Sequence, residues 1–253
     1  MFFTLQKYEE FSFPQNFLRI FYAIDYFSLF FGNIIRLLLG ELLKKLLFMM
    51  RIIVKSEKKS NFVENSKSKK PMIYIESKRK SIEKLKAQYP DAMIIDVTSK
   101  AQDEFVKFSP FFPNGGIPVP FSEGKVAACV EGIWQGLKVF ENDDVDTSFF
   151  YKCDMKNLKR TVRKYGHCLG HRKGVYGKEL LGYIDARKQI YLPCYKWVLE
   201  NKLQKLVTAV RIISKNKPVV LLDYNTNADV NNPESALSHA SLIKAYIEGN
   251  YPE

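Results

Sequence analysis

A polar stretch from Lys55 to Lys70 divides this sequence into two unlike parts. It reads KSEKKSNFVENSKSKK, is rich in lysine and serine, and has no hydrophobic period. A segment of this composition has no apolar face to bury, which is typical of a linker. The sequence therefore predicts an N-terminal segment at 1–54, a linker at 55–71 and a compact domain at 72–253.

The N-terminal segment is hydrophobic but is repeatedly interrupted by charges. Its longest uncharged run, Tyr26 to Ile35, has ten residues, about half of what a membrane-spanning helix needs. From Arg36 to Ile53 the charges share one half of a helical wheel and the large apolar residues the other. Three interpretations stay open: packing on the protein's own core, membrane contact through residues 17–54, or upstream sequence before an internal start at Met49, Met50 or Met72.

The net charge of +12, from 39 Lys+Arg against 27 Asp+Glu, favours a polyanionic ligand such as a nucleotide, a nucleic acid or an anionic membrane. Half of this excess lies in residues 1–70, and eight basic residues gather between Lys152 and Lys173. This cluster is a candidate for phosphate contact, with a solvated basic face as the alternative. The aromatic content of 14% excludes a disordered chain, and four cysteines exclude a disulfide scaffold. A cytoplasmic setting is expected.

Apolar runs and helix signals define the elements of the domain. Strands that can form one small sheet are expected at Met72–Ile75, Ala92–Val97 and Pro218–Tyr224. Helices are expected at Arg79–Tyr89, Val126–Phe140, Asp154–Tyr165, Glu179–Asp185, Tyr195–Ile213 and Pro233–Glu248. The stretch Ser109–Ser122, with four prolines, reads as an ordered loop. The predicted fold class is α+β, mainly helical.

The segment from Val130 to Lys138 carries the sharpest chemical pattern. Glu131, Gln135 and Lys138 stand at i, i+4 and i+7, so one helical face presents an acid, an amide and an amine. Two glycines flank Trp134, and each costs a helix about 1 kcal/mol relative to alanine. They indicate close approach by another helix or by a ligand. The alternative is a solvated helix face.

The residues around this helix resemble a known family. The loop from Phe108 to Pro113 reads aromatic–Ser–x–Phe–aromatic–Pro, and Val-Glu-x-x-x-Gln-x-x-Lys follows it. This order resembles the opening of the NADAR (YbiA-like) superfamily, and looser similarity covers about 108–206. The chain departs from the family pattern at Pro110, where the family has Asn, and at Gly132, where it has His.

The resemblance implies a YbiA-like helical domain with a small sheet that hydrolyses N-glycosidic bonds of ribosides. Similar proteins act in riboflavin metabolism or remove ADP-ribose from guanine bases. The departures at Pro110 and Gly132 leave a second class open, a non-catalytic module that binds a nucleotide or nucleic acid on the same scaffold. The expected partner is an ADP-ribosylated or nucleotide-like substrate.

Cleavage of a ribosyl C–N bond passes through an oxocarbenium-like state, which a carboxylate stabilises or supplies with activated water. Glu131 is the candidate carboxylate, Asp223 a second one, and Lys138 either holds a phosphate or protonates the leaving base. The candidate substrate-binding residues are Ser109, Phe111, Trp134, Gln135, Lys159, Arg160, His171 and Arg172.

Two patterns suggest metals without specifying them, and no metal or cofactor is predicted. His167, Cys168 and His171 lie between glycines in an expected turn rather than on a helix, and no CxxC pair completes a zinc site. From Asp223 to Glu234, oxygen-bearing residues fit a calcium-loop spacing, but Ala228 occupies the position of the turn glycine. An Asn/Asp-rich turn at a strand's carboxyl end is the preferred interpretation, and His239 is expected to be structural.

Overall fold

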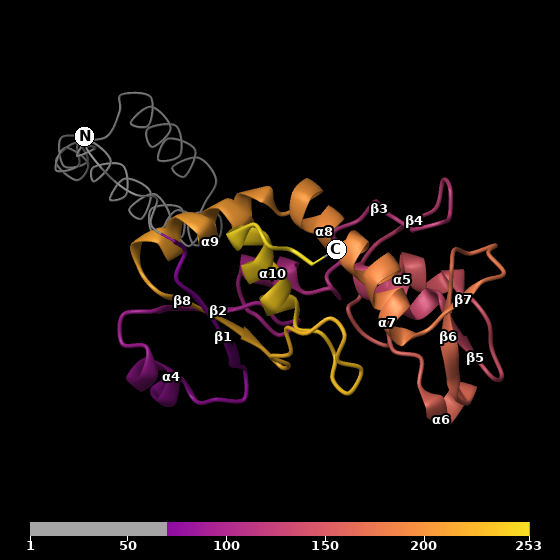
Figure 1. The fold of residues 1–253 in the computed structure, drawn as a ribbon, viewed down its shortest axis with the longest axis horizontal. Helices are drawn as coiled ribbons and strands as arrows, with labels where there is room; N and C mark the ends of the chain where they lie inside the picture. The colour runs from indigo at the N-terminus through magenta and orange to yellow at the C-terminus, as the bar shows by residue number, and fades with distance from the viewer. Residues whose placement is uncertain (1–69, 253) are drawn as a thin grey trace, which may run out of the picture. The chain divides into compact units, whose positions relative to one another are not determined.

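Three parallel strands form the central sheet of the computed structural model, which describes residues 70–252 (Figure 1). β8 (Val219–Asp223) lies between β1 (Ile73–Ser77) and β2 (Met93–Asp96), and Ile73 and Met93 both pair with Val219. The carboxyl ends of all three strands therefore lie at one edge. The predicted three-stranded sheet is confirmed, and the fold is mixed α/β.

The described residues belong to a compact unit from Ser68 to Glu253. The predictions for the segment at 1–54 and for most of the linker at 55–71 lie outside the described residues. Within residues 70–252, no helix is both long enough and apolar enough to cross a membrane.

Helices cover the central sheet. Leu85 of α4 (Ile82–Gln88) packs against apolar side chains of β8. α9 (Gln204–Asn216) contacts β8, and α10 (His239–Glu248) contacts both β1 and β8 (Figure 1). All five residues of β8 are buried, which explains why its sequence is continuously apolar rather than alternating.

Two further sheets were not predicted. An antiparallel sheet has the order β5-β6-β7, and a hairpin pairs β3 with β4. Their strands are β3 (Ile117–Pro118), β4 (Val126–Ala127), β5 (Lys138–Phe140), β6 (Cys168–Arg172) and β7 (Leu180–Leu181). Strands of two to five residues are too short to show a hydrophobic period. β6 replaces the turn that was expected around His171.

The helix predicted at Val126–Phe140 is α5 (Val130–Gly136), which is shorter at both ends. Cys129 begins it, because its Sγ accepts a hydrogen bond from the backbone N–H of Gly132 at 3.2 Å. β4 precedes the helix and β5 follows it. Lys138 therefore projects from a strand, not from the helical face that the spacing predicted.

The two glycines of α5 admit another helix rather than a ligand. A Cβ added to Gly132 would lie 2.5 Å from the carbonyl oxygen of Phe149, and one added to Gly136 would overlap the ring of Phe150. Both neighbours belong to the 3₁₀ helix η2 (Thr147–Tyr151). A histidine at position 132 would thus collide with the backbone of η2.

Of the helix predicted at Asp154–Tyr165, only α6 (Val162–Tyr165) forms. Met155 and Asn157 have φ angles of 57° and 51°, in the left-handed region that interrupts a right-handed helix. The predicted stop is confirmed, since Gly166 caps α6 with a φ of 81°.

The region after β7 is also divided more finely than predicted. The expected helix at Glu179–Asp185 is β7 followed by the short α7 (Tyr183–Ala186). The chain then continues through a π-helical turn, η3 (Arg187–Tyr191), into α8 (Leu192–Asn201). The single long helix predicted at Tyr195–Ile213 is therefore two helices, α8 and α9.

The proline-rich loop at Ser109–Ser122 follows the 3₁₀ helix η1 (Glu104–Phe108). It contains one short strand, β3, which was not predicted. The last helix, α10, begins later than the predicted Pro233, because Ser238 caps it by accepting a hydrogen bond from Ser241 N–H. It ends at Gly249, whose φ is 79°, as predicted.

Candidate functional site

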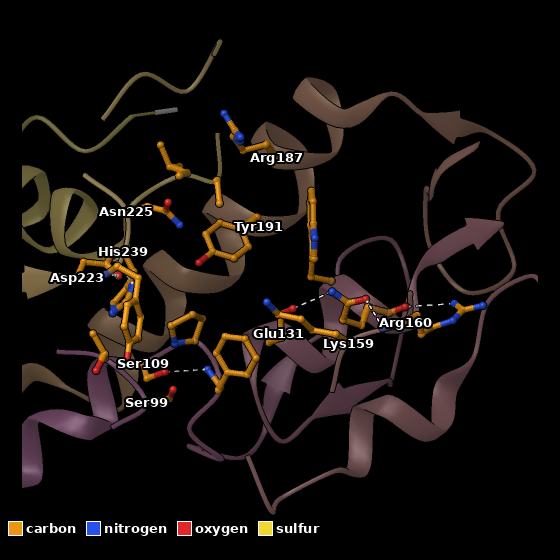
Figure 2. Close-up of a pocket in the computed structure, with 18 of the residues that line it drawn as sticks. Ser99, Ser109, Glu131, Lys159, Arg160, Arg187, Tyr191, Asp223, Asn225 and His239 are labelled. Carbon is orange, nitrogen blue, oxygen red and sulfur yellow. Dashed lines mark hydrogen bonds and ion pairs between the residues drawn. The ribbon is translucent and has the colours of Figure 1, made fainter. Parts of the chain in front are cut away.

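A cavity of about 610 Å³ lies among the carboxyl edge of the central sheet, α5 and η3. Its volume falls within the range of small-molecule sites, about 300–1,000 Å³. Figure 2 shows Glu131, Tyr191 and Asp223 around it. Among the predicted site residues, the following line the cavity: Ser109, Phe111, Glu131, Trp134, Gln135, Lys138, Lys159, Arg160 and Asp223. His171 and Arg172 do not.

Glu131 is a buried carboxyl group on α5 with one side-chain hydrogen bond. Gln135 Nε2 donates to Glu131 Oε1 at 2.8 Å, and the backbone N–H of Glu131 donates to the carbonyl of Pro110 at 2.9 Å. Burial raises the pKa of Glu131, outweighing the hydrogen bond from Gln135 and the charges of Lys138 and Lys159 that lower it. This carboxyl group therefore holds a proton more readily than an exposed one.

Four cations line the cavity without an ion-pair partner among residues 70–252: Arg79, Lys138, Lys159 and Arg187. Burial lowers the pKa of Lys138, although the charge of Glu131 acts in the opposite direction. Lys159 and Arg79 are exposed. Unpaired cations on a concave surface attract anions, so the cavity is suited to a phosphate-bearing ligand.

Arg160 positions Gln135 and does not present its charge to the cavity. Its backbone N–H donates to Gln135 Oε1 at 3.0 Å. Its fully buried guanidinium donates to the carbonyls of Gln135, Lys138 and Asp144 and forms a 2.7 Å ion pair with Asp143. Figure 2 shows this side chain directed away from Glu131 and Tyr191. The expectation that Arg160 binds substrate is not supported by this geometry.

Trp134 provides an aromatic wall of the cavity. Its ring packs against His171 with 3.8 Å between ring centroids, and Tyr183 and Tyr191 meet it edge-on at 5.8 Å. His171 is buried behind Trp134, and neither of its ring nitrogens has a hydrogen-bond partner among the described residues. Burial, and then the charge of Lys138, lower the pKa of His171 to about 3, so its ring is neutral.

Arg172 lies at a separate surface hollow. Its guanidinium pairs with Asp144 at 2.7 Å and donates to the carbonyl of Lys178 at 3.2 Å. Part of the basic cluster is therefore neutralised. Arg172 is in an ion pair, and Lys173 is paired with Glu179 at 2.9 Å. Lys159 is the member of the cluster that brings an unpaired charge to the cavity.

Asp223, at the carboxyl end of β8, forms a buried ion pair with His239. The distance from His239 Nδ1 to Asp223 Oδ2 is 2.9 Å, and His239 Nε2 lies 2.7 Å from the carbonyl of Val97. Burial opposes both charges. The charge of His239 nevertheless lowers the pKa of Asp223, and the charge of Asp223 with the two hydrogen bonds raises the pKa of His239. Ser238 also donates to Asp223 Oδ2, at 2.8 Å.

The aromatic loop supplies a further wall of the cavity. Ser109 Oγ accepts a hydrogen bond from the backbone N–H of Phe111 at 3.3 Å, which fixes the turn around Pro110. The hydroxyl of Tyr195 donates to the carbonyl of Phe108 at 2.7 Å and anchors the start of the loop.

Several cavity residues were missed by the sequence analysis: Arg79, Ser99, Arg187, Tyr191 and Asn225. Arg79, Ser99 and Asn225 each follow a strand of the central sheet within three residues, and the carboxyl ends of parallel strands are the usual place for ligands. From the sequence, this signal pointed to the Asn/Asp-rich turn that begins at Asp223, but it singled out no residue after the other two strands. No sequence signal marked the π-helical turn that carries Arg187 and Tyr191.

A model of a family of unknown function, DUF6939, matches residues 77–243. The chain belongs to this family. The DUF6939 match contains every residue that lines the cavity, from Arg79 to His239. No curated protein and no solved structure matches the chain.

The described residues contain no group of three or more His, Cys, Asp or Glu side chains that could hold a metal ion. In the loop after β8, the side-chain oxygens of Asn227, Asp229 and Asn232 each accept a hydrogen bond from a backbone N–H two residues ahead. They thus stabilise turns of their own loop. This geometry agrees with an Asn/Asp-rich turn.

Proposed function

We propose that the cavity binds an ADP-ribosyl or nucleotide-like riboside and hydrolyses its N-glycosidic bond. The observation that carries this proposal is the environment of Glu131, a buried carboxyl group that has no ion-pair partner among the described residues, in a cavity lined by four cations that also have none there. Such a group is a stronger base than an exposed carboxylate, and pKa values perturbed by burial mark functional sites.

In the proposed reaction, ionised Glu131 accepts a proton from a water molecule as the water oxygen bonds to C1′ of the ribose. The bond between C1′ and the base nitrogen breaks, and its electron pair leaves with the base. Lys138 protonates the leaving base, because burial lowers the pKa of this ammonium group and makes it a better acid. Proton exchange with solvent then restores both groups.

The remaining walls suit the other parts of such a substrate. Trp134 and Phe111 offer aromatic faces for a base, and Lys159 and Arg79 offer charge for phosphate groups. Gln135 orients Glu131 through their hydrogen bond, and Arg160 in turn fixes Gln135. These contacts hold the general base in one geometry.

The resemblance to the NADAR superfamily supports the same activity, since its Glu, Gln and Lys positions correspond to Glu131, Gln135 and Lys138. We extend the proposal to the fold, as a YbiA-like helical domain with a small sheet. The family's His position is Gly132, which packs against η2. The proposed chemistry therefore makes no use of a side chain at that position.

The test is release of ADP-ribose from ADP-ribosylated DNA or RNA, and of free base from phosphorylated pyrimidine ribosides, measured by chromatography. We expect Glu131→Gln to reduce release by about 10²–10⁴-fold, the usual contribution of a general base. The matched control is Glu123→Gln, at an exposed residue outside this cavity, which should leave release unchanged. Absence of release from all these substrates, or equal rates for both variants, would contradict the proposal.

The second candidate function is a non-catalytic nucleotide-binding module. The pairing of Asp223 with His239 favours it, because Glu131 is then the single carboxyl group of the cavity lining that can act as a general base. This function predicts that wild-type protein and Glu131→Gln both bind the nucleotide and that neither releases base.

A further inference from the structure

The helix α7 and the π-helical turn η3 that continues it direct three residues into one cavity. Tyr183, Arg187 and Tyr191 are spaced four apart, and all three line it. In an α-helix of 3.6 residues per turn, residues eight apart are rotated by about 80° from each other. The i→i+5 bonding of a π-turn winds the chain more slowly and keeps Tyr191 on the face of Tyr183. Such turns occur frequently at functional sites.

Two of these three side chains are committed to other parts of the protein. The guanidinium of Arg187 donates to the carbonyls of Val230, Asn232 and Ser235, and it also donates to the hydroxyl of Tyr183 at 2.9 Å. Arg187 thus holds the loop after β8 in place, and Tyr183 accepts one of its hydrogen bonds.

The hydroxyl of Tyr191 is the uncommitted group of the three. No residue among 70–252 hydrogen-bonds to it. Its ring is fixed edge-on to Trp134 and stacked on Tyr195 at 6.2 Å. Figure 2 shows the hydroxyl directed into the space between Asp223 and Glu131. A rigid ring with a free donor is a preorganised ligand contact.

The surroundings of this hydroxyl select the kind of group that it binds. Burial, and then the charges of Glu131 and Asp223, raise its pKa well above the usual value, so the phenol stays neutral and can donate. A phosphate beside two carboxylates would be repelled. A sugar hydroxyl is neutral, accepts a hydrogen bond from a phenol and donates one to a carboxylate.

We propose that the hydroxyl of Tyr191 donates a hydrogen bond to a ribose hydroxyl of the ligand and forms a diol-binding subsite with the carboxylates of Glu131 and Asp223. The identity of the ligand rests on the proposed function. The subsite places the ribose next to Glu131, and it leaves Trp134 for the base and the cations for phosphate.

The test is a two-by-two comparison of binding constants by calorimetry on the full-length protein. Wild-type protein and Tyr191→Phe are each titrated with AMP and with 2′,3′-dideoxy-AMP. We expect Tyr191→Phe to weaken AMP binding by about 3- to 10-fold, the value of one hydrogen bond. The dideoxy ligand, which has no ribose hydroxyls, should bind both proteins equally.

Equal weakening for both ligands, no weakening for either, or failure of the wild-type protein to bind AMP would overturn the inference. Tyr195→Phe is the control, because its hydroxyl bonds to Phe108 outside the cavity. It should lower the melting temperature and keep the preference for AMP. Base release, measured in parallel assays, separates the two proposals. If AMP binding depends on the ribose hydroxyls but no base is released, the proposed hydrolysis is overturned and the diol-binding subsite is not.

Discussion

Glu131 and Asp223 face the same cavity from different elements, and their surroundings differ in one respect. Asp223 has a cationic partner, His239, within 2.9 Å, whereas among residues 70–252 the side chain of Glu131 is hydrogen-bonded only by the amide of Gln135. The pKa of Asp223 is accordingly lowered, while burial raises that of Glu131. The two carboxyl groups of one cavity therefore differ in how readily they hold a proton.

This difference assigns different roles to Glu131 and to the Asp223–His239 pair. Pairs of titratable groups whose environments separate their pKa values mark acid and base functions. Both ring nitrogens of His239 are occupied, by Asp223 and by the carbonyl of Val97. The pair therefore cannot relay protons and instead shapes the wall at the sheet edge. Glu131 is the group free to exchange a proton with a ligand.

The largest expected effect comes from breaking the ion pair between Asp223 and His239. Asp223→Asn leaves His239 as a buried charge without its partner, and loss of one member of a buried pair typically costs about 3–5 kcal/mol. Glu131→Gln should leave the free energy of unfolding unchanged or raise it, because it removes a carboxyl group that burial disfavours. Urea unfolding of both variants measures the contrast.

Urea unfolding should be measured near pH 5.5, because the directions of the two pKa shifts define a pH range in which both stabilise the folded state. The raised pKa of His239 stabilises the fold fully below its ordinary 6.5, and the lowered pKa of Asp223 does so above its ordinary 3.8. Equal losses in the free energy of unfolding for Asp223→Asn and Glu131→Gln at this pH would contradict the distinction between the two carboxyl groups.

His171 extends the comparison, because burial disfavours the charged form of this group as it does that of Glu131. Its lowered pKa means that stability is complete above 6.5 and falls as the pH drops toward about 3. At pH 5 we expect a loss of about 2 kcal/mol relative to pH 7 from this group. His171→Phe keeps an aromatic ring against Trp134 and should flatten this dependence in urea unfolding. An unchanged slope would show that His171 is not held neutral.

The pH dependence of hydrolysis sharpens the roles of Glu131 and Lys138. Activity should fall on the acid side at a pKa above 4.5, where Glu131 gains a proton, and on the alkaline side below 10.5, where Lys138 loses one. Each limb changes the rate by about 10-fold per pH unit. Lys138→Arg should remove the alkaline limb from kcat/KM. Persistence of that limb would assign it to another group.

The smallest effect concerns the exposed cation at the edge of the cavity. Lys159→Gln should weaken AMP binding by about 2- to 5-fold, as expected for one solvent-screened charge. Raising the salt concentration should reduce the difference. Lys156→Gln, at a neighbouring exposed lysine outside the cavity lining, is the matched control. A greater loss for Lys156→Gln would place the phosphate elsewhere on the basic cluster.

The parts of the site that could be predicted are those fixed by local periodicity. The four-residue spacing of Glu131 and Gln135 brought both to one helical face, and the apolar run of β8 placed Asp223 at a strand's carboxyl end. The role of Arg160 could not be predicted, since its burial depends on carbonyls that the fold assembles around it. The glycines of α5 indicated a close approach, but only the structure identifies η2 as the neighbour.

A carboxyl titration by ¹³C NMR tests the difference between Glu131 and Asp223 most directly, with Glu131→Gln and Asp223→Asn used to assign the two signals. We expect Glu131 to titrate above its ordinary 4.5 and Asp223 below its ordinary 3.8. Titration of both groups near their ordinary values, or in the reverse order, would contradict this difference.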